Sequence, residues 1–133
     1  MAAFFFIAAS QLGFSQNVQI KKDIAYVDNE KVLLYEKFNL SEYSLKNVNG
    51  DEVLYFQIKK DAETQEDYLV FNFVNEKRKV QSTSVGRVTA LGVKNMMEKM
   101  LTWLIKDGVI QKDGSINSDK LEIFAQKFDD YKG

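Results

Sequence analysis

The chain contains no cysteine, no histidine and no proline among its 133 residues. Without cysteine and histidine it has no disulfide, no thiolate nucleophile, no imidazole base and none of the ligands on which most zinc, copper and haem sites depend. Acid–base or nucleophilic chemistry would rest on Asp, Glu, Lys, Tyr or Ser alone. We therefore expect a protein that is not an enzyme. A chain free of proline also favours a sheet rich in hairpins.

Charge is balanced in this sequence, and apolar residues are plentiful. The 18 basic and 19 acidic residues give a formal net charge of -1, so no overall field attracts a nucleic acid, and we expect no such partner. Hydrophobic residues make up 45% of the chain, with 10 Phe, 6 Tyr and 1 Trp. A chain of this length and composition is expected to form one domain with a sizeable core.

The N-terminal segment differs from the rest because Met1–Ser15 carry no charge. Its apolar run, residues 4–9, is much shorter than the roughly 20 residues that cross a bilayer, but it suits the apolar centre of a signal peptide. The small residues Gly13 and Ser15 favour cleavage before Gln16. We expect a periplasmic or secreted protein whose mature chain (16–133) is one domain without a membrane span. No Lys or Arg precedes the apolar run, which leaves a truncated start, or a buried N-terminal strand or helix, as alternatives.

The first part of the mature chain has the pattern of short strands separated by turns. Strands are predicted over residues 24–27, 32–35, 43–48, 52–59, 69–73 and 79–83. Residues 28–31 read as a hairpin loop, and Asn49-Gly50 favours a type I′ turn with positive φ at both positions. In the strand over 52–59, Leu54, Phe56 and Ile58 alternate with more polar residues, so these three are predicted to face the core.

The last part of the chain changes to a helical period. An apolar stripe predicts a helix that lies on the sheet, formed by Val93, Met96, Met97, Met100, Leu101, Leu104 and Ile105. Gly108 is placed to end this helix in a left-handed conformation. A second helix is predicted to start at Ser118 as N-cap. The expected fold is α+β, an antiparallel sheet of about five or six strands followed by two C-terminal helices packed on one face.

Two motifs are suggestive, but neither completes a binding site. Asp113–Asn117 resembles part of an EF-hand loop, yet the positions that would carry calcium ligands hold Val109, Gln111 and Lys120. The glycines of Gly86–Lys94 miss the spacing of a phosphate-binding loop. We predict no catalytic, cofactor-binding or metal-binding residue.

Two surfaces remain as candidates for binding. The first is an interaction face of semi-apolar residues on the strand side opposite the predicted core, formed by Val53, Tyr55 and Val70. The second is an apolar pocket between the sheet and the methionine-rich helix, lined by Phe56, Phe71, Phe73, Met96, Met97, Met100 and Trp103. Core packing is the competing interpretation of the methionines.

Several segments share features with one group of proteins. They are Gly13–Gln16, Ile24–Asp28, Asn49–Glu52, Leu104–Ile110, Asp113–Asn117 and Phe124–Tyr131. On these segments the chain resembles small exported proteins of Bacteroidota bacteria. The resemblance implies export and an α+β fold, and it places no active site on these residues.

These observations favour a non-enzymatic binding module of the bacterial envelope. In this hypothesis an exposed sheet face or an edge strand meets another envelope protein. The alternative is a carrier of an apolar small molecule, held in the pocket under the methionine-rich helix. The two hypotheses differ in where the ligand contacts the sheet, since they use opposite faces.

Overall fold

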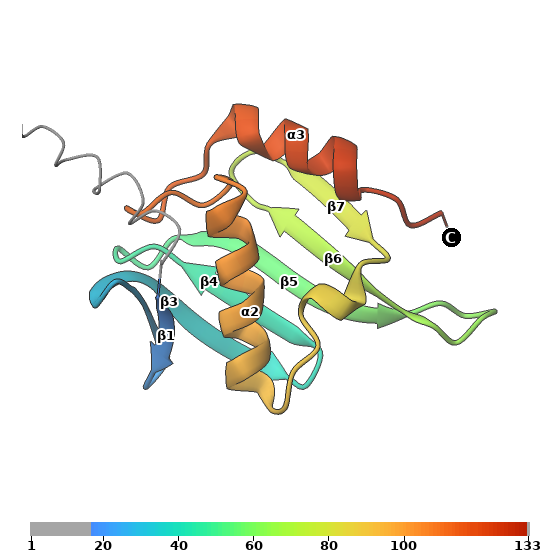
Figure 1. Cartoon of the computed structure of the whole chain (residues 1–133), viewed down its shortest axis with the longest axis horizontal. Coiled ribbons are helices and arrows are strands. Elements are labelled where there is room, and N and C mark those ends of the chain that lie inside the picture. Colours follow the sequence, from blue (N-terminus) through green and yellow to red (C-terminus); the bar gives the residue numbers. More distant parts are fainter. Residues whose placement is uncertain (1–16, 133) are drawn as a thin grey trace, which may run out of the picture.

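A computed structural model describes residues 17–132 of the chain. It is a seven-stranded antiparallel sheet in the order β1 to β7, with two helices on one face (Figure 1). The elements are β1 (Val18–Lys21), β2 (Ile24–Val27), β3 (Glu30–Asn39), β4 (Glu42–Lys46), β5 (Glu52–Lys60), β6 (Asp67–Phe73), β7 (Arg78–Ser82), the short helix η2 (Val85–Arg87), α2 (Val93–Lys106) and α3 (Ser118–Phe128). The predicted signal peptide and its cleavage before Gln16 lie outside the described residues.

The predicted α+β class is confirmed, and the strand count is higher than expected. The additional strand is β1, which pairs with β2 through a turn at Lys22 and Asp23. Both turn residues have positive φ, 51° and 66°, a backbone conformation that Gly, Asn and Asp adopt most readily. Lys22-Asp23 is neither the Asn-Gly nor the Asp-Gly pair that marks a two-residue hairpin, so this strand was not predicted.

Two other hairpin turns also differ from the prediction. Asp28 and Asn29 have φ of 53° and 71°, so the turn is two residues long and β3 begins at Glu30. At the hairpin between β4 and β5 only Gly50 has positive φ, 93°. Asn49 does not have positive φ. The Asn47 side chain accepts hydrogen bonds from the N–H groups of Asn49 and Asp51 at 2.9 and 3.0 Å, and these bonds stabilise a longer turn in place of the type I′ turn.

The C-terminal end of α2 is as predicted, and the N-cap of α3 lies one residue earlier than predicted. Gly108 has φ of 78°, and its N–H donates to the Ile105 carbonyl at 3.0 Å, so it ends α2 as predicted. The N-cap of α3 is Asn117, whose side chain accepts from the Lys120 N–H at 3.0 Å. Ser118 is therefore the first residue of the helix and not its cap.

The hydrophobic core fills the space between α2, α3 and one face of the sheet. The β5–β6 register pairs Leu54 with Phe73 and Phe56 with Phe71, and these side chains are at most 1% exposed. Neighbouring aromatic rings of sheet and helices lie 5.0–6.4 Å apart, in a cluster formed by Phe56, Phe71, Phe73, Trp103, Phe124 and Phe128. Edge-to-face contacts in this cluster hold both helices on the sheet.

Both edges of the sheet are occupied. At the β1 edge, the Ile20 N–H donates to the Glu98 carboxylate of α2 at 2.7 Å. At the β7 edge, the segment after α3 runs beside the strand and makes three backbone contacts: Gln81 N–H to Asp129 at 2.8 Å, Thr83 N–H to Asp130 at 2.8 Å, and Tyr131 N–H to the Gln81 carbonyl at 3.0 Å. These contacts use groups that another strand would need for pairing.

Candidate functional site

One face of the sheet turns away from both helices and, among residues 17–132, no element covers it (Figure 1). Tyr55 and Gln57 of β5 point to this uncovered face, because Leu54 and Phe56 point into the core. Antiparallel sheets commonly have one solvated face, so the absence of a cover is not itself evidence of function. The side chains on the face decide what it can bind.

The structure divides the predicted interaction face. Leu45 pairs with Leu54 and Lys46 with Glu52, so Val53 is the extra residue of a bulge, and it joins the core with 4% of its surface exposed. The placement of Val53 on the opposite face was wrong, since a bulge breaks strand alternation. Val70 lies on the uncovered face between Gln57 and Gln81, but it is only 3% exposed.

Tyr55 is the predicted residue that remains accessible on the uncovered face, and it has an aromatic neighbour. Phe38, the extra residue of a bulge in β3, lies with its ring centroid 6.2 Å from that of Tyr55. It is 51% exposed. The sequence analysis missed Phe38 because the predicted strand ended at residue 35.

A polar network surrounds this aromatic pair. The Glu42 carboxylate accepts hydrogen bonds from Asn39 at 2.8 Å and from Gln57 at 3.0 Å. Hydrogen bonds from Asn39, Tyr55 and Gln57 to the charged carboxylate lower the pKa of Glu42. The pKa of Tyr55 is raised, first by burial and then by its hydrogen bond to Glu42. Tyr55 therefore lies beside both the Glu42 carboxylate and the Phe38 ring.

The predicted apolar pocket is filled by its own side chains. Phe56, Phe71, Met97 and Met100 are fully buried and belong to the core, and Met96 packs against it half-buried. Two members of the predicted set line surface cavities: Trp103 lines one beside α2, and Phe73 lines one at the β6–β7 turn. The carrier hypothesis therefore has no preformed cavity under α2 to support it.

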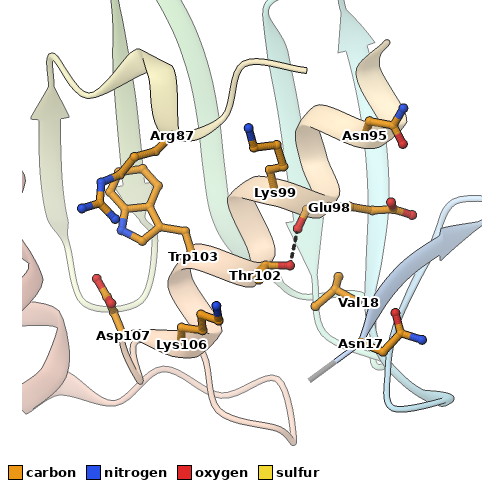
Figure 2. Close-up of a pocket in the computed structure, with 10 residues that line it drawn as sticks. All are labelled: Asn17, Val18, Arg87, Asn95, Glu98, Lys99, Thr102, Trp103, Lys106 and Asp107. Carbon is orange, nitrogen blue, oxygen red and sulfur yellow. Dashed lines mark hydrogen bonds between the residues drawn. The ribbon is translucent and has the colours of Figure 1, made fainter. Parts of the chain in front are cut away.

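A groove runs along the solvent-facing side of α2, between the start of β1 and η2 (Figure 2). Its volume is about 530 Å³, within the range of small-molecule sites. The residues that line it are Asn17, Val18, Arg87, Asn95, Glu98, Lys99, Thr102, Trp103, Lys106 and Asp107. Most of them are polar or charged, so the groove differs in character from the apolar pocket that the sequence predicted.

One end of the groove contains Arg87 and Trp103. The Arg87 guanidinium lies over two rings, 5.1 Å from the centre of Trp103 and 4.7 Å from that of Phe128. Trp103 is 6% exposed, and its Nε1–H is buried without a hydrogen-bond partner among the described residues. Arg87 was not among the predicted site residues, because the short helix η2 has no periodic sequence pattern that would identify it.

Some groups in the groove are already engaged. Glu98 accepts the hydrogen bond from the Ile20 N–H, and the Thr102 hydroxyl donates to the Glu98 carbonyl at 2.7 Å. Lys99 Nζ donates to the Thr89 carbonyl at 2.8 Å. These bonds hold the middle of the groove in place and leave Arg87 and Trp103 as donors at its end.

Within residues 17–132, no three acidic side chains come together in a group that could hold a metal ion. The helices of this part of the chain are also too short or too polar to cross a membrane. Comparison with protein families, with curated proteins and with solved structures finds no match to this chain. The function is therefore inferred from the chemistry of the surfaces described above.

Proposed function

We propose that this protein is a non-enzymatic binding module of the bacterial envelope that binds a partner protein through the uncovered face of its sheet. The observation that carries the proposal is the aromatic pair Phe38 and Tyr55, which lies on the face that neither helix covers. Envelope localisation is supported by the uncharged segment Met1–Ser15, which has the composition of an export signal.

The chemistry of the pair favours a protein partner. Aromatic side chains dominate the binding energy of protein interfaces when a partner excludes water around them. Phe38 is half-exposed in the free protein, and the Tyr55 ring lies next to it, with 6.2 Å between the ring centroids. Neither ring lines the groove of about 530 Å³ beside α2, so this surface suits another surface better than a small molecule.

The occupied edges favour the face over strand addition as the binding mode. A peptide that extends a sheet needs free backbone groups on an edge strand. Ile20 at one edge and Gln81 at the other already form hydrogen bonds within the chain. The partner is therefore expected to contact side chains of β3, β4 and β5 rather than the backbone of β1 or β7.

The test is site-specific photo-crosslinking in the host envelope. A photoreactive phenylalanine analogue at position 38 should give one defined crosslinked protein. The matched control carries the analogue at position 91, since Leu91 is 90% exposed and precedes α2, away from the uncovered face. With the crosslinked protein purified, Phe38→Ser should weaken its binding at least about tenfold, the scale of an aromatic interface residue, whereas Leu91→Ser should not.

Equal crosslinking from positions 38 and 91, or no product from position 38, would contradict the proposal. Unchanged affinity of Phe38→Ser for the purified partner would contradict it as well. Both substitutions remove an exposed apolar side chain and are expected to change stability by less than about 1 kcal/mol. Urea unfolding of the two variants checks that a loss of binding is not a loss of fold.

A further inference from the structure

We propose that the groove along α2 binds a small organic molecule through an oxyanion group, a carboxylate or a phosphate, received by Arg87 and Trp103. This site is independent of the proposed protein interface, because α2 covers the opposite face of the sheet (Figure 1). The proposal rests on two donors that the described chain leaves without an acceptor at the same end of one groove (Figure 2).

Arg87 is oriented without being neutralised. Its guanidinium is held against Trp103 and Phe128 at 5.1 and 4.7 Å from the ring centres, and this stacking leaves the planar edge with its N–H donors free. Among residues 17–132 no carboxylate forms an ion pair with it. A guanidinium in this arrangement matches the paired oxygens of a carboxylate or phosphate.

Trp103 supplies the second donor. Trp103 is only 6% exposed, and its Nε1–H has no hydrogen-bond partner among the described residues. Buried donors in folded proteins almost always have an acceptor, because a buried donor without a hydrogen bond destabilises the fold. Figure 2 shows the indole nitrogen at the end of the groove where the Arg87 guanidinium and the Asp107 carboxylate also lie.

The charge around this end permits an anion. The groove is lined by three cationic side chains, Arg87, Lys99 and Lys106, and by two carboxylates, Glu98 and Asp107. The Glu98 carboxylate is turned to the backbone of β1, where it accepts the Ile20 N–H. Asp107 is the carboxylate that a bound anion would approach, and the three cationic side chains of the lining outnumber it.

The rest of the groove indicates a polar body for the ligand. Beyond the cationic end it presents the amide of Asn17, with Val18 as the apolar contact. The Asn95 and Thr102 side chains donate to backbone carbonyls at 2.7 Å, and their oxygens remain as acceptors. Amide and hydroxyl groups bind hydroxylated molecules by hydrogen bonds. A hexose that carries one oxyanion group therefore combines both features, and the unmodified hexose is its neutral counterpart.

Trp103 provides the signal for the test, because it is the only tryptophan of the chain. The full-length protein is titrated with glucuronate, glucose 6-phosphate and glucose while Trp103 fluorescence is followed. We expect a saturable change with glucuronate, with glucose 6-phosphate or with both, and none with glucose. Binding by only one of the two anions identifies the oxyanion as carboxylate or phosphate.

Variants distinguish binding at this site from a general effect of the protein's net charge. Arg87→Gln should weaken binding at least about tenfold, as expected for a hydrogen bond to a charged group, and Arg87→Lys should also weaken it, because lysine lacks the planar fork. Lys94→Gln is the matched control, since it changes net charge equally from an exposed position of α2 outside the groove. Trp103→Phe, followed by calorimetry, removes the Nε1–H and should also weaken binding.

The thermal unfolding midpoint of each variant shows whether it is folded, and the Arg87→Lys variant retains the charge and stacking if Arg87→Gln does not fold. No binding of either anion, equal binding of glucose, or equal weakening by Lys94→Gln and Arg87→Gln would overturn the proposal. Photo-crosslinking from position 38 is unaffected by any of these outcomes, so this proposal and the proposed protein interface fail separately.

Discussion

The two faces of the sheet are made by alternate residues of the same strands, yet they are buried in different ways. On β6, Phe71 points to the helices and contacts rings of both α2 and α3 at 5.6 and 5.4 Å between centroids. Its neighbour Asn72 points the other way and stays half-buried. Burial on the covered face therefore depends on helices far along the chain, whereas burial on the uncovered face depends on neighbouring strands.

The difference between the faces has one exception, which is Val70. It lies on the uncovered face but is buried between its cross-strand neighbours Gln57 and Gln81. The two glutamines flank this small β-branched residue on the same face of the sheet. A solvated sheet face thus contains buried positions of its own.

The largest expected effect contrasts two adjacent residues of β6. Phe71→Ala should lower the free energy of unfolding by about 3–5 kcal/mol, because it removes the ring that connects the sheet to Trp103 and Phe124 and leaves a cavity. Asn72→Ala on the uncovered face should cost less than about 1 kcal/mol. Urea unfolding of both variants measures the difference. Equal losses of unfolding free energy in the two variants would mean that both faces of the sheet contribute equally to stability.

An intermediate effect on stability is expected at Val70, which is buried although it lies on the uncovered face. Val70→Ala should cost about 1–2 kcal/mol, less than Phe71→Ala, because fewer atoms are removed and the side chains around this position can move to fill the space. Gln57→Ala, at the position paired with Val70, should cost less than about 1 kcal/mol. If Val70→Ala were as harmless as Gln57→Ala in the same assay, the burial of Val70 would contribute nothing to stability.

The smallest expected effect concerns one corner of the uncovered face and depends on pH. Tyr131 stacks on Tyr68 with ring centroids 3.6 Å apart, and its hydroxyl donates to the Asp61 carboxylate at 2.6 Å. This hydrogen bond, with those from the backbone of Thr64 and Glu63, lowers the pKa of Asp61 from 3.8 to about 2. The pKa of Tyr131 is raised by the same contact.

A lowered pKa in the folded state stabilises the fold above the unfolded pKa of Asp61, and this contribution is lost as pH falls from about 4 towards about 2. Tyr131→Phe keeps the stacked ring but removes the donor. The wild type should therefore have the higher urea midpoint at pH 7, and the gap should narrow as pH falls to 2. Tyr26→Phe is the control for loss of a hydroxyl. A gap that does not change with pH would show that Asp61 is not involved.

Much of the fold was predictable because it is encoded in local patterns. The alternation of Leu54, Phe56 and Ile58 identified the core face of β5, and the apolar stripe of α2 identified the helix and its end at Gly108. The strand β1 was not predictable, because Lys22-Asp23 forms its turn without the Asn-Gly or Asp-Gly pair that usually signals a two-residue hairpin. Pairing with β2 compensates for that local cost.

The candidate sites were predictable only in part. Tyr55 was identified from strand alternation, but Val53 was misplaced by a bulge and Phe38 was missed beyond the end of the predicted strand. Trp103 was assigned to an apolar pocket under α2, whereas its ring packs in the core and its indole nitrogen lies at the end of a polar groove. Bulges and helix packing depend on contacts between distant residues, which one-dimensional periodicity does not contain.

Residue spacing along the chain was enough to predict six of the seven strands and both long helices, and the apolar side of most of them, because these properties are local. Tertiary structure alone decided that Glu98 and the segment after α3 occupy the two sheet edges. It also decided that Arg87 stacks on Trp103 and Phe128 and that Phe38 meets Tyr55. Each of these contacts joins residues from different elements, and their positions relative to one another exist only after the core between sheet and helices has formed.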